Sequence, residues 1–182
     1  MQDPKQLIRD VPNFPKAGIM FRDITPLLAH GPAWHETVDR IAERYRGRID
    51  IVLGIESRGF LIGSAVAYAL GCGIAVVRKP GKLPAAKFNA TYALEYGVDT
   101  LEIHQDAFTP GSRVLVVDDL LATGGTAEAA ISLVRQLRGE VIEAAFIIEL
   151  TFLSARQRLA PWPVFSLIQY ESEWEKNCLR EL

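Results

Sequence analysis

The segment with the most chemical content is residues 114–126, which read Val-Leu-Val-Val-Asp-Asp-Leu-Leu-Ala-Thr-Gly-Gly-Thr. The apolar run predicts a buried strand, and open α/β sheets bind ligands at the carboxyl ends of such strands. The two glycines lack a Cβ, so the backbone can turn sharply and approach a ligand closely. A helix that begins there offers free N–H groups and a favourable dipole to an anion, and the threonine hydroxyls add donors. The sequence therefore predicts a cradle for a phosphate monoester, formed by Ala122, Thr123, Gly124, Gly125 and Thr126.

Next to this loop stands an acidic pair, Asp118 and Asp119. Beside a bound sugar phosphate, carboxylates are suited to accept hydrogen bonds from two ribose hydroxyls. Taken singly, a Gly-Gly or Asp-Asp pair is mostly structural, as a tight turn or a helix entry. The order strand, acid pair, Thr-Gly-Gly-Thr and helix is much more specific. It is not a P-loop, which needs Gly-Lys-Ser/Thr, and Gly71 and Gly73 lack the third glycine of a dinucleotide fingerprint.

A basic stretch precedes this segment. Residues 57–94 contain no Asp or Glu, although 22 acids in 182 residues would place about 4 or 5 in a run of that length. A local excess of cations indicates an anionic ligand larger than one phosphate. Burial explains part of this lack of acidic residues, because residues 59–77 have the pattern of a buried helix and strand. The cations of the stretch are Arg58, Arg78, Lys79, Lys82 and Lys87.

The elements that must position these residues alternate along the chain. Apolar spacing predicts helices over about 34–46, 59–70, 126–138 and 152–159, and buried strands over 51–55, 74–77, 114–117, 141–150 and 164–168. Residues 79–90 read as a long loop, and residues 91–95 and 100–104 as two strands around a turn. Strands that alternate with helices indicate a mostly parallel sheet with helices on both faces.

Composition limits the classes of protein that remain. A chain of 182 residues, 49% apolar, fits one domain spanning residues 1–182 with a core of its own. The net charge of −2 argues against a nucleic-acid binder, and no apolar run is long enough to cross a membrane. Cys72 and Cys178 share no spacing motif and no signal peptide is visible, so we expect a cytoplasmic protein. His30, His35 and His104 share no spacing that would indicate a metal site or a catalytic triad.

The 114–126 segment resembles the PRPP-binding motif of type I phosphoribosyltransferases. The flanking motifs follow the order found in members that act on adenine; they are Val-Pro-Asn-Phe-Pro-Lys-Ala-Gly-Ile-Met-Phe-Arg-Asp-Ile-Thr-Pro at 11–26, Glu-Ser-Arg-Gly-Phe at 56–60, Arg-Lys-Pro-Gly-Lys-Leu-Pro at 78–84 and Tyr-Ala-Leu-Glu-Tyr-Gly at 92–97. The resemblance covers nearly the whole chain. It implies a mostly parallel central sheet flanked by helices, a base-binding segment at 1–33, and a flexible loop and hairpin at 79–104 over the active site. It also implies the reaction of adenine with PRPP to give AMP and pyrophosphate.

The resemblance further implies a role for particular residues. It assigns Arg58, Arg78, Lys79 and Lys82 to the pyrophosphate, whose departing charge such cations would stabilise. Magnesium would be carried mainly by PRPP and pyrophosphate oxygens, with few or no direct protein ligands. A non-proline cis peptide is expected between Glu56 and Ser57.

For the base, the resemblance places Phe21 and Leu150 on the two faces of adenine, with Arg22 close by. It makes Glu95 the acid or base that contacts adenine N7, with Arg58 as the second catalytic residue. Without the resemblance, Phe21 and Leu150 could be core residues, and Glu95 only a carboxylate on a strand. The resemblance also implies a homodimer whose active site lies close to the interface.

Other readings stay open at this stage. One is a sister enzyme acting on hypoxanthine, guanine or xanthine, because nothing in the residue pattern alone selects adenine. Another is a regulator that senses PRPP or a purine without turnover. A purely structural α/β domain is a third, although it would have no need of a loop rich in cations and free of acids.

Overall fold

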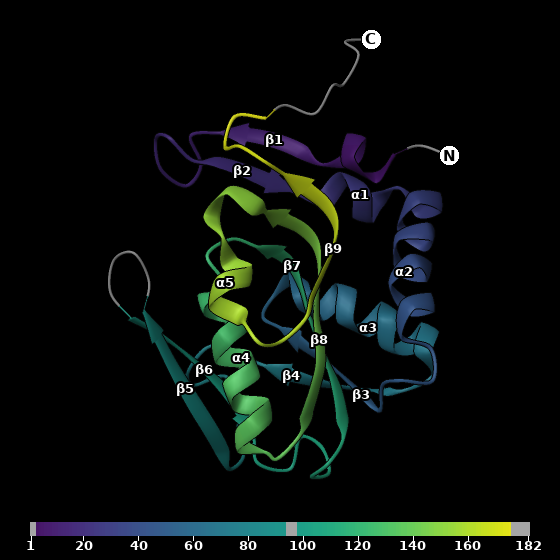
Figure 1. Ribbon diagram of the computed structural model, residues 1–182, viewed down its shortest axis with the longest axis vertical. Helices are drawn as coiled ribbons and strands as arrows, with labels where there is room; N and C mark the ends of the chain where they lie inside the picture. The colour runs from purple at the N-terminus through teal and green to yellow at the C-terminus, as the bar shows by residue number, and fades with distance from the viewer. Residues whose placement is uncertain (1–2, 94–97, 176–182) are drawn as a thin grey trace.

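The centre of the molecule is a five-stranded, fully parallel sheet in the order β4-β3-β7-β8-β9 (Figure 1). The computed structural model describes residues 3–93 and 98–175. The strands are β3 (Ile51–Ile55), β4 (Gly73–Val77), β7 (Arg113–Leu121), β8 (Glu140–Leu150) and β9 (Val164–Tyr170). The predicted mostly parallel sheet is confirmed. β7 is longer than predicted, because its pairing with β8 continues through the acid pair as far as Leu121.

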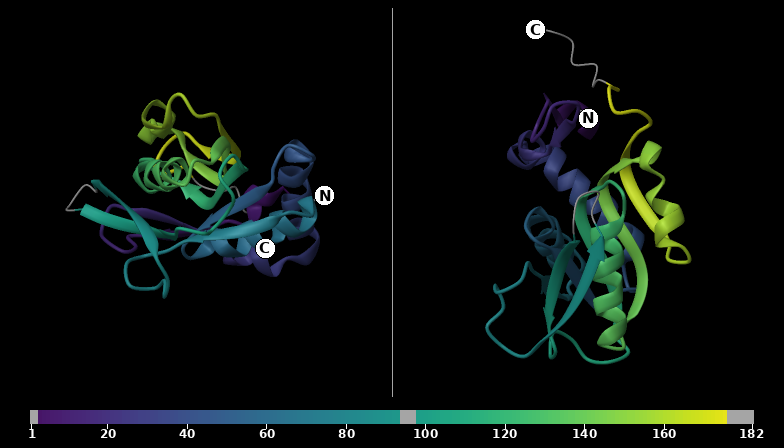
Figure 2. Two further views of the ribbon diagram at one scale, coloured as in Figure 1. Left: turned by 90° about the horizontal axis from the view of Figure 1, so that it is seen from below. Right: turned by 90° about the vertical axis from the view of Figure 1, so that its left-hand side faces the viewer.

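Helices cover both faces of this sheet (Figure 2). On one side lie α1 (Thr25–Ala29), α2 (Gly31–Tyr45) and α3 (Arg58–Leu70), and on the other lie α4 (Gly125–Gln136) and α5 (Ala155–Leu159). Successive side chains of β7 point to opposite faces of the sheet, so they contribute to two separate core clusters. Val114 and Val116 join the cluster that contains α4, while Leu115 and Val117 join the cluster that contains α2 and α3. None of the described helices is long and apolar enough to cross a membrane.

Two antiparallel hairpins stand outside the central sheet. β1 (Arg9–Pro12) pairs with β2 (Met20–Asp23), and β5 (Lys87–Ala93) pairs with β6 (Val98–His104). Short 3₁₀ turns occupy Pro4–Leu7 and Thr151–Leu153. The predicted loop over 79–90 is too long, because Lys87 already pairs with His104 at the start of β5. The first hairpin was not predicted, since its strands of four residues each are too short to show a periodicity.

The order of the strands creates a switch point between β3 and β7. From β3 the chain runs through α3 to β4 on one side, and from β7 it runs through α4 to β8 on the other. The loops that leave these two neighbouring strands therefore diverge to opposite faces of the sheet. In open α/β folds the crevice between two such loops is the position where ligands bind.

Candidate active site

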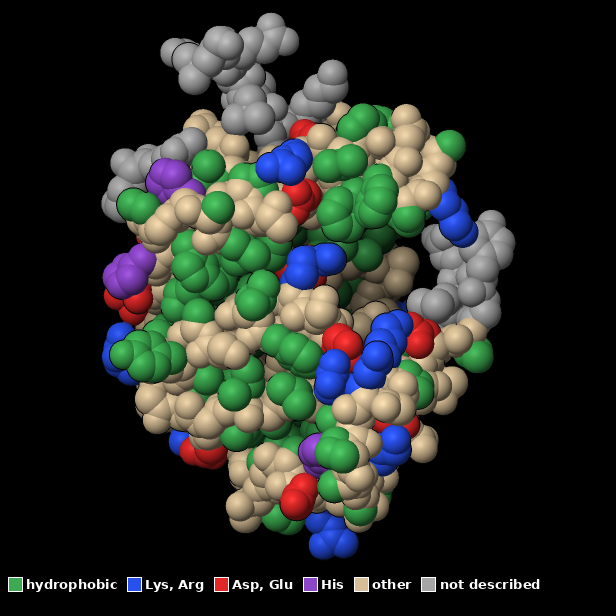
Figure 3. All heavy atoms as spheres, turned by 180° about the vertical axis from the view of Figure 1, so that it is seen from behind, with side chains coloured by type: hydrophobic (Ala, Val, Ile, Leu, Met, Phe, Trp, Pro, Cys, Tyr) green, Lys and Arg blue, Asp and Glu red, His purple; other side chains and the backbone are tan. Residues whose placement is uncertain are grey.

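A cavity of about 260 Å³ lies at this switch point. Its walls come from the loop after β3, the loop after β7 and the hairpin of β5 and β6. It brings together most of the predicted phosphate and ribose ligands, namely Arg58, Lys79, Asp118, Asp119, Ala122, Thr123, Gly124, Gly125 and Thr126. Figure 3 shows Lys and Arg side chains gathered beside a hollow on one face of the molecule.

The predicted phosphate cradle has the geometry that its glycines suggest. Gly124 lies in the left-handed region with φ of 84°, and α4 begins at the next residue. The first helical hydrogen bond runs from the Glu128 N–H to the Gly124 carbonyl, at 2.9 Å. The N–H groups of the turn before it have no acceptor within the helix, so they are available to an anion. A Cβ on Gly124 would lie 3.3 Å from the Cβ of Ala155, so α5 supports the cradle from behind.

The acidic pair is held from two sides. Asp119 is only 4% exposed, and its carboxylate accepts a hydrogen bond from Arg58 Nε. Asp118 Oδ1 accepts a hydrogen bond from the Asp119 N–H at 2.9 Å. Burial, and then the charge of the neighbouring Asp119 carboxylate, raise the pKa of Asp118 well above its usual value. The environments of the two carboxylates therefore differ. Asp119 has a cationic partner in Arg58, whereas burial disfavours the ionised form of Asp118.

Glu56 organises the cations on the other side of the cavity. Its carboxylate accepts two hydrogen bonds from the Arg78 guanidinium, at 3.1 and 3.3 Å, and one from the Lys79 N–H at 2.8 Å. Burial opposes ionisation, but these hydrogen bonds together hold the pKa of Glu56 below its usual value. The Lys79 ammonium pairs with Asp99, which raises the pKa of Lys79. The peptide bond between Glu56 and Ser57 is cis, as the resemblance implied.

Two predicted pyrophosphate ligands, Arg78 and Lys82, stand beside the cavity and do not line it. Arg78 Nη1 donates to the Lys82 carbonyl at 3.4 Å, and the Lys82 residue is exposed. The other two members of this group, Arg58 and Lys79, line the wall of the cavity. Glu95 lies outside the described residues, so its predicted role stays a prediction.

A second, more apolar cavity of about 370 Å³ adjoins the first. It is lined by Phe21, Arg22 and Leu150, the three residues predicted to surround the base. The two cavities share Arg58, Leu120 of β7 and the first two residues of the cradle, Ala122 and Thr123. The Arg58 guanidinium also lies 5.4 Å from the centroid of the Phe21 ring. The cavity predicted for the phosphorylated sugar and the cavity predicted for the base are therefore continuous.

Arg22 lines this second cavity, but its charge is committed elsewhere. The residue is 3% exposed, and its guanidinium pairs with Asp10 and donates to the Glu173 carbonyl at 2.9 Å. It also stacks on the Tyr170 ring, with 3.9 Å between the guanidinium carbon and the centroid. We conclude that Arg22 ties the N-terminal hairpin to the C-terminal segment and forms a wall of the base cavity.

Sequence reasoning missed other residues of the site. Tyr92 was quoted only as part of a motif, yet its hydroxyl contacts Thr126 Oγ1 at 3.3 Å and donates to Asp99 at 3.1 Å. Leu153 and Glu173 line the base cavity and carried no signal in the sequence. Leu153 lies in the 3₁₀ turn that follows β8. Glu173 reaches the cavity because β9 returns the chain beside the N-terminal hairpin, a contact between the two ends that no local pattern shows.

A predicted phosphate cradle, an acidic pair and an adjoining apolar cavity at the switch point of an α/β sheet are features typical of proteins that bind or form nucleotides. Residues 28–179 match the model of the phosphoribosyl transferase domain. The chain belongs to the phosphoribosyltransferase family.

Within this family, the chain is similar to proteins named adenine phosphoribosyltransferase. The chain is 58% identical to an adenine phosphoribosyltransferase of Chloroflexus aurantiacus, over 93% of this chain and 98% of that protein. It is 55% identical to one of Trichlorobacter lovleyi, over 93% of this chain and all of that protein. Among solved structures, the adenine phosphoribosyltransferase of Thermoanaerobacter pseudethanolicus has a TM-score of 0.89 at 48% identity, over 91% and 97% of the two chains. That of Saccharomyces cerevisiae, solved with an imino-altritol bisphosphate and adenine, has a TM-score of 0.86 at 43% identity, over 91% and 97%.

Proposed function

We propose that the chain transfers the 5-phosphoribosyl group from PRPP to adenine and releases AMP and pyrophosphate. The observation that carries this proposal is the continuity of the two cavities through Arg58 and the cradle. A phosphate held on the cradle places a ribose beside Asp118 and Asp119, and the ring cavity then opens at the anomeric carbon. The names of the relatives supply the choice of adenine over other bases.

The reaction exchanges one bond at the anomeric carbon of the ribose. The bond to the pyrophosphate oxygen breaks and a bond to adenine N9 forms, through a transition state with oxocarbenium character. Arg58 and Lys79 line the cavity where the pyrophosphate charge develops, and cations held there lower the barrier. Arg78 and Lys82 stand next to it and extend the positive field. Asp118 and Asp119 orient the ribose through its hydroxyls.

The base must lose a proton as its N9 bonds to the sugar. We assign this proton to Glu95: adenine that carries its ring proton on N7 attacks through the N9 lone pair, and the Glu95 carboxylate would take the N7 proton as the new bond forms. Phe21 and Leu150 hold the ring in the orientation that the attack needs, since an aromatic ring that stacks on the base adds about 0.5–1.5 kcal/mol. Closure of the 79–104 segment would exclude water, which otherwise hydrolyses PRPP.

Magnesium is part of this proposal. Two carboxylates of the cavity wall are already paired, Glu56 with Arg78 and Asp119 with Arg58, so the protein offers the ion few free oxygens. Bound to PRPP, the ion would neutralise diphosphate charge. We propose that most of its ligands are PRPP oxygens and waters, because Mg²⁺ dehydrates reluctantly and often binds with substrate phosphates.

A single assay tests the proposed function. Pyrophosphate release is measured with PRPP, magnesium and one base at a time from adenine, hypoxanthine, guanine and xanthine. The expected result is turnover with adenine far above the other three. Turnover with another purine and not with adenine would make the chain a sister enzyme. Binding of PRPP and adenine with no pyrophosphate release from any base would indicate a regulator.

We also propose that the protein is a homodimer and works in the cytoplasm. The cytoplasmic location rests on the two cysteines, Cys72 and Cys178, which share no spacing motif of a disulfide framework. The dimer rests on an exposed apolar face of α3, to which Leu61 and Tyr68 contribute. The observation that supports a link to the site is that α3 begins at Arg58, in the wall of both cavities.

A further inference from the structure

The C-terminal segment, residues 171–175, lies against the N-terminal hairpin and forms one side of the base cavity. Lys5 Nζ donates to the Glu175 carboxylate at 2.6 Å, and the Glu171 N–H donates to the same carboxylate at 2.7 Å. The Arg22 guanidinium donates to the Glu173 carbonyl at 2.9 Å. These hydrogen bonds fix the segment on both sides of Glu173.

The side chain of Glu173 is placed by β2. Its Oε1 accepts a hydrogen bond from the Met20 N–H at 2.6 Å. Met20 immediately precedes Phe21, the ring predicted to stack on the base, so the carboxylate lies beside this stacking position. Among the described residues that line the base cavity, Glu173 is the one carboxylate. An ionised carboxylate only accepts hydrogen bonds, and with one oxygen committed to Met20 it still has a second oxygen to offer.

The direction of the base in the cavity follows from the ribose. The wall shared with the phosphate cavity contains Arg58, Ala122 and Thr123, so N9 of a purine must face that side. The six-membered ring then faces the opposite side. Glu173 lines the base cavity and is absent from the shared wall. The six-membered ring, which carries the group on C6, is therefore the part of the base that can approach the Glu173 carboxylate.

We propose that Glu173 is a specificity-determining residue whose carboxylate accepts a hydrogen bond from the 6-amino group of the base. The inference rests on the proposed function and names the group that selects the base. Adenine carries an N–H donor at this position, whereas hypoxanthine, guanine and xanthine carry a carbonyl oxygen. A carboxylate binds the donor and opposes the acceptor, so one side chain favours adenine and disfavours the three 6-oxopurines.

The test compares two substitutions in the same segment, Glu173→Gln and Glu175→Gln. In the first variant the single amide oxygen stays with the Met20 N–H, so the amide NH₂ would face the base. We expect kcat/KM for adenine to fall about tenfold or more, kcat/KM for hypoxanthine to rise, and KM for PRPP to stay unchanged. Glu175→Gln is the control, because Glu175 anchors the segment to Lys5 without lining the cavity, and its adenine-to-hypoxanthine ratio should match the wild type.

A second measurement links the side chain to the 6-amino group itself. The ratio of kcat/KM for adenine to that for unsubstituted purine is measured in the wild type and in Glu173→Gln. The wild-type ratio should be about ten or more, and the variant should bring it close to one. An unchanged ratio in Glu173→Gln, or an equal loss in Glu175→Gln, would overturn the proposal. If the variant does not fold, the adenine-to-purine ratio of the wild type still tests the proposal. Equal kcat/KM values for purine and adenine in the wild type would overturn it. Wild-type protein that releases no pyrophosphate with adenine would contradict the proposed function instead.

Discussion

At the scale of single residues, the acidic pair shows how the site differs from a merely stable fold. Asp118 is a carboxyl group that the fold disfavours in its ionised form, since burial and the Asp119 carboxylate both raise its pKa. A group whose folded-state pKa is raised costs stability at a pH above that pKa, and this cost disappears below the unfolded-state pKa. The proposed role of Asp118 would account for this cost, because an ionised carboxylate is a strong acceptor for the ribose hydroxyls.

The first prediction concerns Asp118→Asn, which keeps the acceptor for the Asp119 N–H but removes the charge. The variant should melt at a higher temperature than the wild type at pH 8, and this difference should shrink as the pH falls toward 4. Its affinity for PRPP should fall, because a neutral amide is a weaker acceptor for hydroxyls than a carboxylate. Thermal unfolding across the pH range and PRPP titration check both parts. An equal stability gain at both pH values would refute the account of Asp118.

The second prediction concerns Glu95, in the segment outside the described residues. Glu95→Gln keeps the shape and a hydrogen-bonding group but cannot exchange a proton. We expect kcat with adenine to fall by about 10²–10⁴-fold, the usual contribution of general acid–base catalysis, with little change in the Kd for PRPP. Asp118→Asn should show the opposite division between kcat and PRPP affinity. Wild-type turnover in Glu95→Gln, or a loss confined to PRPP binding, would show that the assigned role is wrong.

At the scale of elements, the sequence predicted the helices and strands that local residue patterns indicate. Apolar runs predicted the five strands of the sheet, and Gly-Gly after β7 predicted where α4 begins. The acid pair was expected after the strand but lies within β7, because pairing with β8 is a contact between distant segments. For the same reason Tyr92 and Glu173 were missed: the site contains them only because the second hairpin and the C-terminal segment fold back on it. Arg22 was placed near the base by resemblance, and the structure adds its ties to Asp10 and Tyr170.

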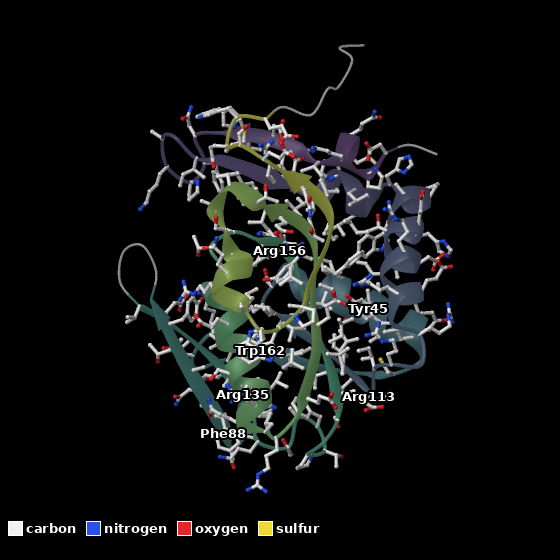
Figure 4. All side chains as sticks on the ribbon, viewed as in Figure 1. Tyr45, Phe88, Arg113, Arg135, Arg156 and Trp162 are labelled. Atoms are coloured by element: carbon white, nitrogen blue, oxygen red, sulfur yellow. The ribbon has the colours of Figure 1, made fainter. Side chains whose placement is uncertain are left out.

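Helix α5 depends on one buried acid. Glu149, at the end of β8, is 2% exposed and accepts two hydrogen bonds, both at 2.7 Å, from the guanidinium of Arg156. Arg156 is labelled in Figure 4. It also accepts one from Ser166 Oγ on β9 at 2.6 Å. This ion pair binds α5 to two strands of the sheet. Because Ala155 packs against Gly124, it also supports the phosphate cradle.

The third prediction is that Arg156→Met destabilises the protein by roughly 1–3 kcal/mol, because it leaves a buried carboxylate without its cation. It should also raise KM for PRPP, since α5 would no longer hold the cradle in place. Arg158→Met is the matched control on the same helix. The side chain of its partner Glu128 is 44% exposed, so breaking that pair should cost less than about 1 kcal/mol. Chemical unfolding and steady-state kinetics measure both effects, and equal costs for the two variants would contradict this role of Glu149.

At the scale of the whole molecule, α3 links the surface to the site. Its first residue, Arg58, lines both cavities, while Leu61 and Tyr68 are 54% and 90% exposed on the outer side. These two positions are seven residues apart, so they lie on one face of the helix. Ile74 of the neighbouring β4 is 38% exposed, and Figure 3 shows hydrophobic side chains gathered on the face of the molecule that α3 covers. Exposed apolar side chains grouped in this way are typical of a surface that another protein covers.

The fourth prediction is that a second copy of the chain covers this face, and that Tyr68→Glu converts the dimer to a monomer in sedimentation experiments. A charge in an apolar contact is costly when it has no partner, so the substitution should act on assembly and leave the fold intact. The matched control is Val98→Glu, which changes a residue that is 72% exposed on the second hairpin and should leave the dimer unchanged. Because α3 carries Arg58 into the site, the monomer should also bind PRPP more weakly. A wild-type protein that sediments as a fully active monomer would rule out the dimer and its link to the site.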